Sequence, residues 1–198
     1  NSPGGSAVAS DEISAAVKKS EKPVISQIRE VGASGGYWIA SATEQIIANR
    51  MSITGSIGVI SSYIEFSDLM KEYGIGHQRM VAGKYKDIGT PLRKLKEEEE
   101  KLLQKKINRI HEYFIEEISN NRGLEKDQVK KIATGEFYLG IEALNLGLVD
   151  QLGDKETVNE YLKSKHNIED IDYVVYQKEA GFLDLLSGVF SNFFFNIG

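Results

Sequence analysis

The chain contains no cysteine among its 198 residues. This absence excludes disulfide bonds, zinc sites built on thiolates and a cysteine nucleophile. A domain without cysteine folds equally well in reducing and oxidising compartments, so composition leaves the compartment open. Histidine is scarce as well, because only His77, His111 and His166 are present, and their spacing does not match a metal site. We therefore expect neither a bound metal nor a cofactor.

Positive charge is not in excess. The chain has 24 lysines and arginines against 29 aspartates and glutamates, which gives a formal net charge of −5. No cluster of basic residues with interleaved aromatics occurs in the sequence. Such a chain has no strong field to attract nucleic acid, so we expect no nucleic-acid partner. An apolar fraction of 41% is that of an ordinary folded protein with a core.

A hydrophobic run long enough to span a membrane is also missing. The C-terminal stretch, residues 181–198, is rich in phenylalanine and leucine, but Asp184 and other polar residues interrupt it. It is shorter than the roughly 20 apolar residues that a spanning helix needs. The stretch either lies at a membrane interface or, as is more common for apolar tails, packs on the protein's own core or on a neighbouring subunit. We predict one domain over residues 1–178 and a tail over residues 179–198.

The apolar pattern predicts strands and helices in alternation. The strongest helix runs from Leu95 to Ser119, where apolar residues recur at steps of three and four. Other helices are predicted over residues 10–20, 66–73, 126–134, 141–146 and 154–165 and from residue 37 onward, and strands over residues 24–28, 45–48, 57–60, 78–81 and 172–176. This alternation indicates an α/β fold with mostly parallel strands.

Ser34 stands at a sharp turn between a predicted strand and a predicted helix, in the small-residue segment 32–36. That order presents the turn residue at the end of a sheet. The glycines that follow leave room for a substrate backbone, and nearby N–H groups can face a developing oxyanion. The turn taken alone fits an ordinary helix cap more often than a nucleophile, because small-residue turns are common.

A serine nucleophile needs a base, which is either a histidine or a neutral lysine. None of the three histidines lies in a motif-like setting. Lys86 stands out because its segment, residues 83–87, follows a predicted strand and leads into a glycine-containing loop. A lysine acts as a base only if burial or positive neighbours lower its pKa. The residues leave this open, since Lys86 fits equally well as a surface lysine paired with Asp87.

Six short stretches together resemble the signal peptide peptidase A family, which are Ser/Lys-dyad proteases with the fold of Clp protease and crotonase. The stretches are Asn1–Gly5, Lys22–Val24, Ala33–Tyr37, Thr54–Val59, Lys84–Asp87 and Gly147–Asp150. Each is weak alone, but their order and spacing over residues 1–155 are highly specific. The resemblance implies an α/β fold of stacked ββα units with mostly parallel strands, from which an N-terminal portion is missing in this chain.

The resemblance also implies roles for individual residues. Ser34 matches the nucleophile and Lys86 the general base. Ser56 matches the serine that hydrogen-bonds the lysine and holds it neutral. Gly5 and Gly35 match the positions whose backbone N–H groups form the oxyanion hole. No metal belongs to such a site.

The function that the resemblance implies is that of a serine endopeptidase. Its substrates would be cleaved remnant signal peptides and other hydrophobic peptides at the membrane. The chain carries one copy of each motif, so we expect a homo-oligomer, in which the serine and lysine of one site can come from adjacent chains. The resemblance further implies membrane association through an N-terminal anchor, with a soluble catalytic domain on the extracytoplasmic side.

Several alternatives stay open. Lys84 is the alternative base if Lys86 does not serve. The stomatin-type membrane-bound serine proteases share fold and chemistry, but their nucleophile segment resembles Ser-Ala-Gly rather than the Ser-Gly-Gly-Tyr found here. A non-proteolytic crotonase-fold enzyme or a scaffold would explain the oxyanion-hole glycines, but not the coincidence of Ser34 with Lys86. Residues 29–31 are more polar than the family leads us to expect, which points to a difference in the substrate groove or an interface.

Overall fold

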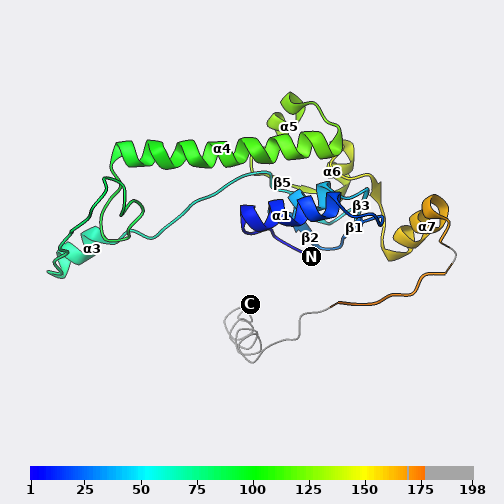
Figure 1. The fold of residues 1–198 in the computed structure, drawn as a ribbon, viewed down its shortest axis with the longest axis horizontal. Helices are drawn as coiled ribbons and strands as arrows, with labels where there is room; N and C mark the ends of the chain where they lie inside the picture. Colours follow the sequence, from blue (N-terminus) through cyan, green and yellow to red (C-terminus); the bar gives the residue numbers. More distant parts are fainter. Residues whose placement is uncertain (169, 177–198) are drawn as a thin grey trace. The chain divides into compact units, whose positions relative to one another are not determined.

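The computed structural model describes residues 1–168 and 170–176 (Figure 1). Asn1–Tyr161 form one compact unit, and a second unit begins at Leu162. The helices are α1 (Ala7–Lys18), α2 (Gly35–Ser41), α3 (Ser67–Glu72), α4 (Glu97–Arg122), α5 (Lys126–Ile132), α6 (Gly140–Asn145) and α7 (Lys155–His166). The strands are β1 (Ile25–Ile28), β2 (Val31–Ala33), β3 (Gln45–Ala48), β4 (Ile53–Gly55), β5 (Phe137–Leu139) and β6 (Gln151–Leu152). The tail predicted over residues 179–198 lies outside the described residues.

The strands of the first unit form two three-stranded sheets, in the orders β1-β3-β6 and β2-β4-β5. All pairs are parallel except β4 with β5. A short bend leads from β1 to β2, and another leads from β3 to β4, so the same two chain segments contribute to both sheets. Ile25 pairs with Gln45 in one sheet and Val31 pairs with Ile53 in the other. The predicted α/β fold with mostly parallel strands is confirmed.

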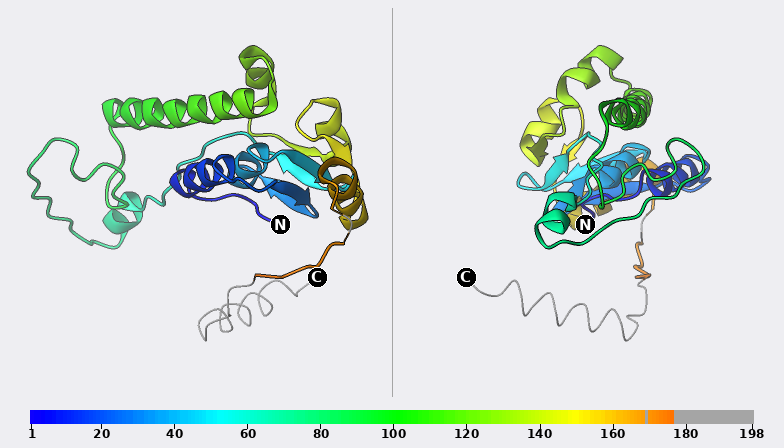
Figure 2. Two further views of the ribbon diagram at one scale, coloured as in Figure 1. Left: turned by 45° about the vertical axis from the view of Figure 1, so that its right-hand side comes forward. Right: turned by 90° about the vertical axis from the view of Figure 1, so that its left-hand side faces the viewer.

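The core forms where α2 meets α4 and the strands. Trp38 of α2 stacks on Phe114 of α4 with ring centroids 4.7 Å apart, and Tyr37 donates a hydrogen bond of 2.8 Å to the carbonyl of Leu148. The remaining fully buried apolar side chains are mostly branched aliphatics, among them Ile46, Ile47, Ile57, Ile118 and Val129. Figure 2 shows that α4 runs alongside α2 and the sheets. Packing on this core fixes α2, and with α2 the turn that precedes it.

Residues 59–96 connect the core to the start of α4 and are called the arm here. The arm contains α3, which lies beyond the N-terminal end of α4, away from the strands (Figures 1 and 2). The strands predicted over residues 57–60 and 78–81 are wrong, because no strand is formed there. Ile57 is buried in the core, but the apolar side chains that follow it in the arm are exposed, with Ile60 at 86% and Met80 at 90% of their full exposure.

The strand predicted over residues 172–176 is also wrong, since this part of the second unit has no regular secondary structure and its valines are exposed. Within the described part of the chain, no helix combines the length and the hydrophobicity needed to cross a bilayer.

Candidate active site

Ser34 occupies the junction of β2 and α2, as its sequence setting predicts. Its backbone has φ 51° and ψ −124°, which is unusual for a residue other than glycine. The N–H of Ser34 donates to the carbonyl of Gly55 at 2.8 Å, and its carbonyl accepts from Trp38 at 2.9 Å. Its hydroxyl makes no hydrogen bond to any described residue and does not cap α2. A strained backbone held on both sides and an unengaged hydroxyl fit a nucleophile better than a helix cap.

The turn formed by residues 3–5 packs directly on this junction. A Cβ atom placed on Gly4, whose φ is +98°, would lie 2.7 Å from the backbone nitrogen of Gly35 and 2.8 Å from Cβ of Ser34. A Cβ atom placed on Gly35 would lie 3.3 Å from the backbone nitrogen of Gly5 and 2.3 Å from Oγ of Ser10. The backbone nitrogens of Gly5 and Gly35 therefore lie near each other and beside Ser34. The structure thus brings together the two residues predicted to form the oxyanion hole.

Ser34 lines two cavities. One, of about 320 Å³, is shared with Gly5 and Gly35 and is walled mainly by small and apolar residues: Ala7, Trp38, Val59, Ile60, Ile110 and Phe114. The other, of about 400 Å³, is shared with Ser56 and with polar side chains of α4. Ser34 thus stands between an apolar hollow that adjoins the predicted oxyanion hole and a more polar one.

Ser56 lies in the more polar cavity because it directly follows β4, the strand that pairs with β2. It follows Gly55, whose carbonyl holds the N–H of Ser34, and its φ of 50° is again unusual for a residue other than glycine. Its hydroxyl donates only a long hydrogen bond, 3.3 Å, to the carbonyl of Gly135. The hydroxyl oxygen therefore remains able to accept a hydrogen bond from an ammonium group that enters this cavity.

Lys86 is not brought to Ser34 within one chain. It lies in the arm, is exposed, and lines neither cavity that contains Ser34. Its backbone N–H closes a turn by donating to Gly83 at 3.1 Å. Its ammonium forms no hydrogen bond or ion pair with the residues that the structure describes, and in particular it does not pair with Asp87.

Lys84 is poorly suited to act as the alternative base. Its ammonium donates to the carboxylate of Glu98 at 2.6 Å and lies 4.9 Å from the ring centroid of Tyr85. The hydrogen bond to Glu98 raises the pKa of Lys84 above its ordinary value. A base must lose its proton near the working pH, so this shift has the wrong sign.

His111 has no motif-like setting in the sequence, but it lines the polar cavity together with Ser34. Its Nε2 is 3.2 Å from the carbonyl oxygen of Ile57. A carbonyl only accepts, so Nε2 carries the proton and is not free to take one from Ser34. The sequence signal was the position of His111 one residue beyond Ile110 of the apolar stripe, which turns it toward the same side of α4.

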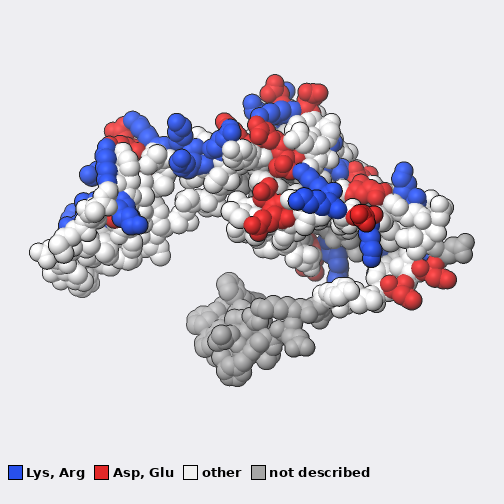
Figure 3. All heavy atoms as spheres, in the orientation of Figure 1, with Lys and Arg blue, Asp and Glu red and all other residues white. Residues whose placement is uncertain are grey.

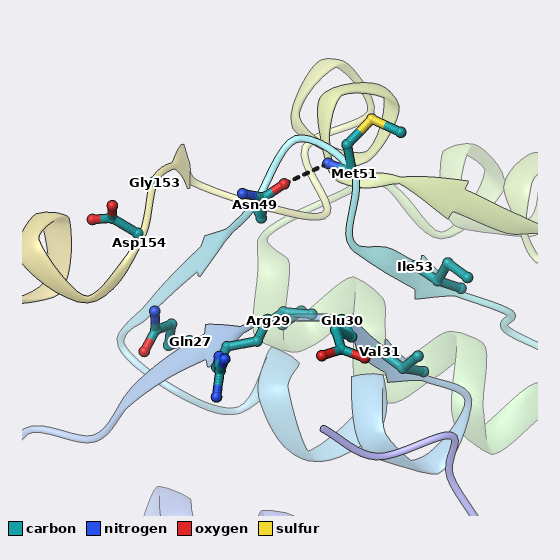
Figure 4. Close-up of a pocket in the computed structure, with 10 residues that line it drawn as sticks. Gln27, Arg29, Glu30, Val31, Asn49, Met51, Ile53, Gly153 and Asp154 are labelled. Carbon is teal, nitrogen blue, oxygen red and sulfur yellow. Dashed lines mark hydrogen bonds between the residues drawn. The ribbon is translucent and has the colours of Figure 1, made fainter.

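The polar residues 29–31 lie elsewhere. Arg29 and Glu30 form the bend between β1 and β2 and line a separate hollow of about 510 Å³, which also takes in Asn49 and Asp154 (Figure 4). Figure 4 shows Arg29 and Glu30 on one bend between the sheets, Asn49 on the other, and Asp154 on the segment that leads to α7. None of them lines a cavity that contains Ser34, so this departure from the family pattern is separate from the candidate site.

Comparison with known proteins gives consistent matches. The sequence matches the family described as "Peptidase family S49" over residues 16–169. It is 37% identical, over 90% of its length, to a protein of Methanocaldococcus jannaschii provisionally named a protease, and it covers 58% of that protein. It is 32% identical, over 97% of its length, to the chloroplastic serine protease SPPA of Arabidopsis thaliana, and it covers 29% of that protein. It is 38% identical, over 80% of its length, to Protease 4 of Haemophilus influenzae, and it covers 26% of that protein.

Proposed function

The chain belongs to peptidase family S49, and from this premise we propose that it is a serine endopeptidase with Ser34 as nucleophile and Lys86 as general base. The observation that carries the proposal is the strained, unengaged Ser34 beside the backbone nitrogens of Gly5 and Gly35. Relatives named serine protease SPPA and Protease 4 support the same activity. The match to peptidase family S49 and the relative named SPPA confirm the resemblance to the signal peptide peptidase A family.

The reaction is an acyl transfer. A neutral Lys86 removes the proton of the Ser34 hydroxyl while Oγ attacks the carbonyl carbon of the scissile bond. The negative charge that develops on the carbonyl oxygen is stabilised by the N–H groups of Gly5 and Gly35. The lysine returns its proton to the leaving amine, and a water molecule, activated in the same way, hydrolyses the acyl-enzyme.

We propose that the lysine reaches the serine from another copy of the chain. Lys86 lines neither cavity at Ser34 in its own chain, whereas Ser56, its proposed hydrogen-bond partner, does. The arm that carries Lys86 also exposes apolar side chains along much of its length: Ile60, Tyr63, Ile64, Leu69, Tyr73, Ile75 and Met80. In Figure 3 the part of the arm around α3 is mostly uncharged. An exposed apolar segment of this kind is typical of an interface between subunits.

The substrates that we propose are hydrophobic peptides, including the remnants of signal peptides at a membrane. The cavity beside Gly5 and Gly35 supports this class, because Trp38, Ile110 and Phe114 supply an apolar wall next to the nucleophile. An apolar side chain of the substrate would be removed from water there. Membrane association and an extracytoplasmic catalytic domain remain part of the proposal.

The proposal is tested by labelling the full-length protein with a fluorophosphonate, which reacts with activated serines. We expect stoichiometric labelling of Ser34, none in Ser34→Ala, and at least a hundredfold slower labelling in Lys86→Ala with the fold retained. No labelling of the intact oligomer would contradict the peptidase assignment and would favour a non-proteolytic enzyme of the crotonase fold. Full labelling of Lys86→Ala would contradict the assignment of the base.

A further inference from the structure

Four charged side chains connect the loop of residues 83–90, called the Lys86 loop here, to the beginning of α4. Arg79, Asp87, Arg93 and Glu99 form one continuous hydrogen-bonded group, called the Arg93 cluster here. Asp87 accepts from Nε and Nη2 of Arg79 at 2.6 and 2.8 Å. It also accepts from Nε and Nη2 of Arg93 at 3.0 and 3.1 Å. Both oxygens of Asp87, the residue after Lys86, are thus held by two guanidinium groups.

Arg93 stands at the centre of the cluster. Besides its bonds to Asp87, it donates to both oxygens of Glu99 at 2.7 Å and to the carbonyl of Lys94 at 3.1 Å. A guanidinium group has five N–H donors, and every one of them is used. A lysine could keep the charge but could not reproduce this planar fork.

Glu99 ties the cluster to the helix. It is 2% exposed, lies in the first turn of α4 and accepts a third hydrogen bond, of 2.9 Å, from the N–H of Lys96. Hydrogen bonds from Arg93 and from that N–H lower the pKa of Glu99 to about 2, so the carboxylate is charged at neutral pH. Buried ion pairs often add little net stability because desolvation offsets their attraction. Their attested use is to fix one geometry among several, and that use fits this position.

Besides the Arg93 cluster, one ion pair links the Lys86 loop to α4, that of Lys84 with Glu98, and its two side chains are 60% and 46% exposed. Residues 75–96 contain no helix or strand, and the loop itself is closed only by successive backbone turns, with N–H groups of residues 86, 88 and 90 donating to carbonyls three positions earlier. Asp87 belongs to these turns, since its carbonyl accepts from Thr90 at 3.1 Å. Because an exposed ion pair such as Lys84–Glu98 contributes little, the position of the Lys86 backbone relative to α4 is set mainly at the carboxylate of Asp87, which is 17% exposed.

We propose that Arg93 and Glu99 are positioning residues for Lys86, which fix the place from which its ammonium is offered to Ser34 of another chain. The inference rests on the proposed function, because it presumes that Lys86 is the base. Displacing a reacting group by about 1 Å can reduce the rate by about a hundredfold. Loss of the fork at Arg93 should accordingly reduce turnover without affecting substrate binding.

The direct test is Arg93→Lys in the full-length protein, compared with Arg109→Lys as a matched control. Arg109 lies on α4 and, like Arg93, forms an ion pair with a glutamate, Glu112, but its side chain is 57% exposed. We expect Arg93→Lys to lower kcat for a peptide substrate by roughly 10- to 100-fold with KM within about twofold of wild type. Arg109→Lys should match wild type in both constants. An unchanged kcat, or a raised KM with unchanged kcat, in Arg93→Lys would overturn the proposal.

A second comparison separates positioning from general damage to the fold. In a Lys86→Ala background, Arg93→Lys should slow the residual fluorophosphonate labelling no further, because a residue that acts through Lys86 has nothing left to act on. A further loss equal to that in the wild-type background would refute the positioning role. If Lys86→Ala alone does not slow labelling, the assignment of the base has failed, and the positioning role fails with it.

Glu99→Gln supplies an independent variant should Arg93→Lys not fold. It keeps the shape of the side chain and removes the charge that orients Arg93, so it should reproduce the loss of kcat. Glu116→Gln is its control, because Glu116 also lies on α4 and forms a partly exposed ion pair, with Lys126 of α5. Equal activity of the two glutamine variants would contradict the proposal.

Discussion

Replacing Gly4 by alanine tests whether the turn of residues 3–5 shapes the active site. The new Cβ would lie 2.7 Å from the backbone nitrogen of Gly35, whereas ordinary contacts begin at 3.4 Å, so the two segments must separate by roughly 0.7 Å. The same atom would lie 2.8 Å from Cβ of Ser34, and the φ of +98° at Gly4 is one that alanine rarely adopts. The substitution therefore moves Gly35, a proposed oxyanion donor, away from the place where the charge would develop.

The loss of one such donor costs about 2.7–4 kcal/mol of transition-state stabilisation, or a 100- to 1,000-fold fall in kcat. We expect Gly4→Ala to show a decrease in that range for peptide hydrolysis, with the oligomer intact. Gly123→Ala is the matched control, because Gly123 also has a positive φ, +63°, but a Cβ there meets no atom within 4 Å. It should lose about 1 kcal/mol of stability and keep full activity. Activity of Gly4→Ala within twofold of wild type would refute this account of the site.

Three other predictions concern stability and are measured by urea unfolding. Phe114→Ala should cost about 3–5 kcal/mol, because Phe114 is buried against Trp38 and its removal leaves a cavity; a loss below 1 kcal/mol would contradict that packing. Asp150→Ala should cost about 1–3 kcal/mol, because its carboxylate accepts at 2.7 Å from a backbone N–H of β3 that would lose its partner; Asp127→Ala, at an exposed carboxylate, should change little. The pKa of Glu99 falls from 4.5 to about 2 on folding. The carboxylate therefore contributes its full stabilising free energy above the pH that equals its ordinary pKa, and this contribution is lost as the pH falls toward the lowered pKa. Between about pH 5 and about pH 2 the wild type should therefore lose more stability than Glu99→Gln, and equal losses would contradict the Arg93 cluster.

The fold could be predicted where the signal was local and long. The helix predicted over residues 95–119 is α4, which extends three residues farther. Its apolar stripe divides, since Ile118 is buried in the core whereas Ile107 and Ile110 line the cavities at Ser34, and Phe114 between them does both. Which part of a stripe packs and which part borders a cavity depends on the neighbouring helix, and periodicity along one helix does not carry that information.

The strands were harder to predict for two physical reasons. Strands β2, β4 and β5 have three residues each, and the first two contain a glycine, so they show no alternation to recognise. Conversely, residues 57–60 and 78–81 have the composition of strands, but Ile60, Met80 and Val81 are exposed on the arm. An apolar segment that is covered by another subunit has the same composition as one that is covered by its own sheet.

The candidate site could be predicted in the same uneven way. The turn at Ser34 is encoded by a few adjacent residues, and the structure confirms its strand–turn–helix setting. The rest of the site joins distant parts of the chain: Gly5 lies near Gly35, and Ser34 shares a cavity with Ser56. Only the family resemblance predicted that these residues belong to one site. The contribution of His111 to that cavity was not predicted, because it depends on how α4 is turned about its axis.

The central claim, that the dyad is shared between chains, is tested most directly by mixing two inactive full-length variants. Ser34→Ala lacks the nucleophile and Lys86→Ala lacks the base. In mixed oligomers, Ser34 of a Lys86→Ala chain can meet Lys86 of a Ser34→Ala chain. If the lysine acts across the interface, subunit exchange should restore up to about a quarter of the wild-type sites, because each partner is then the required one about half the time. If the dyad is completed within one chain, the mixture will be as inactive as its two components.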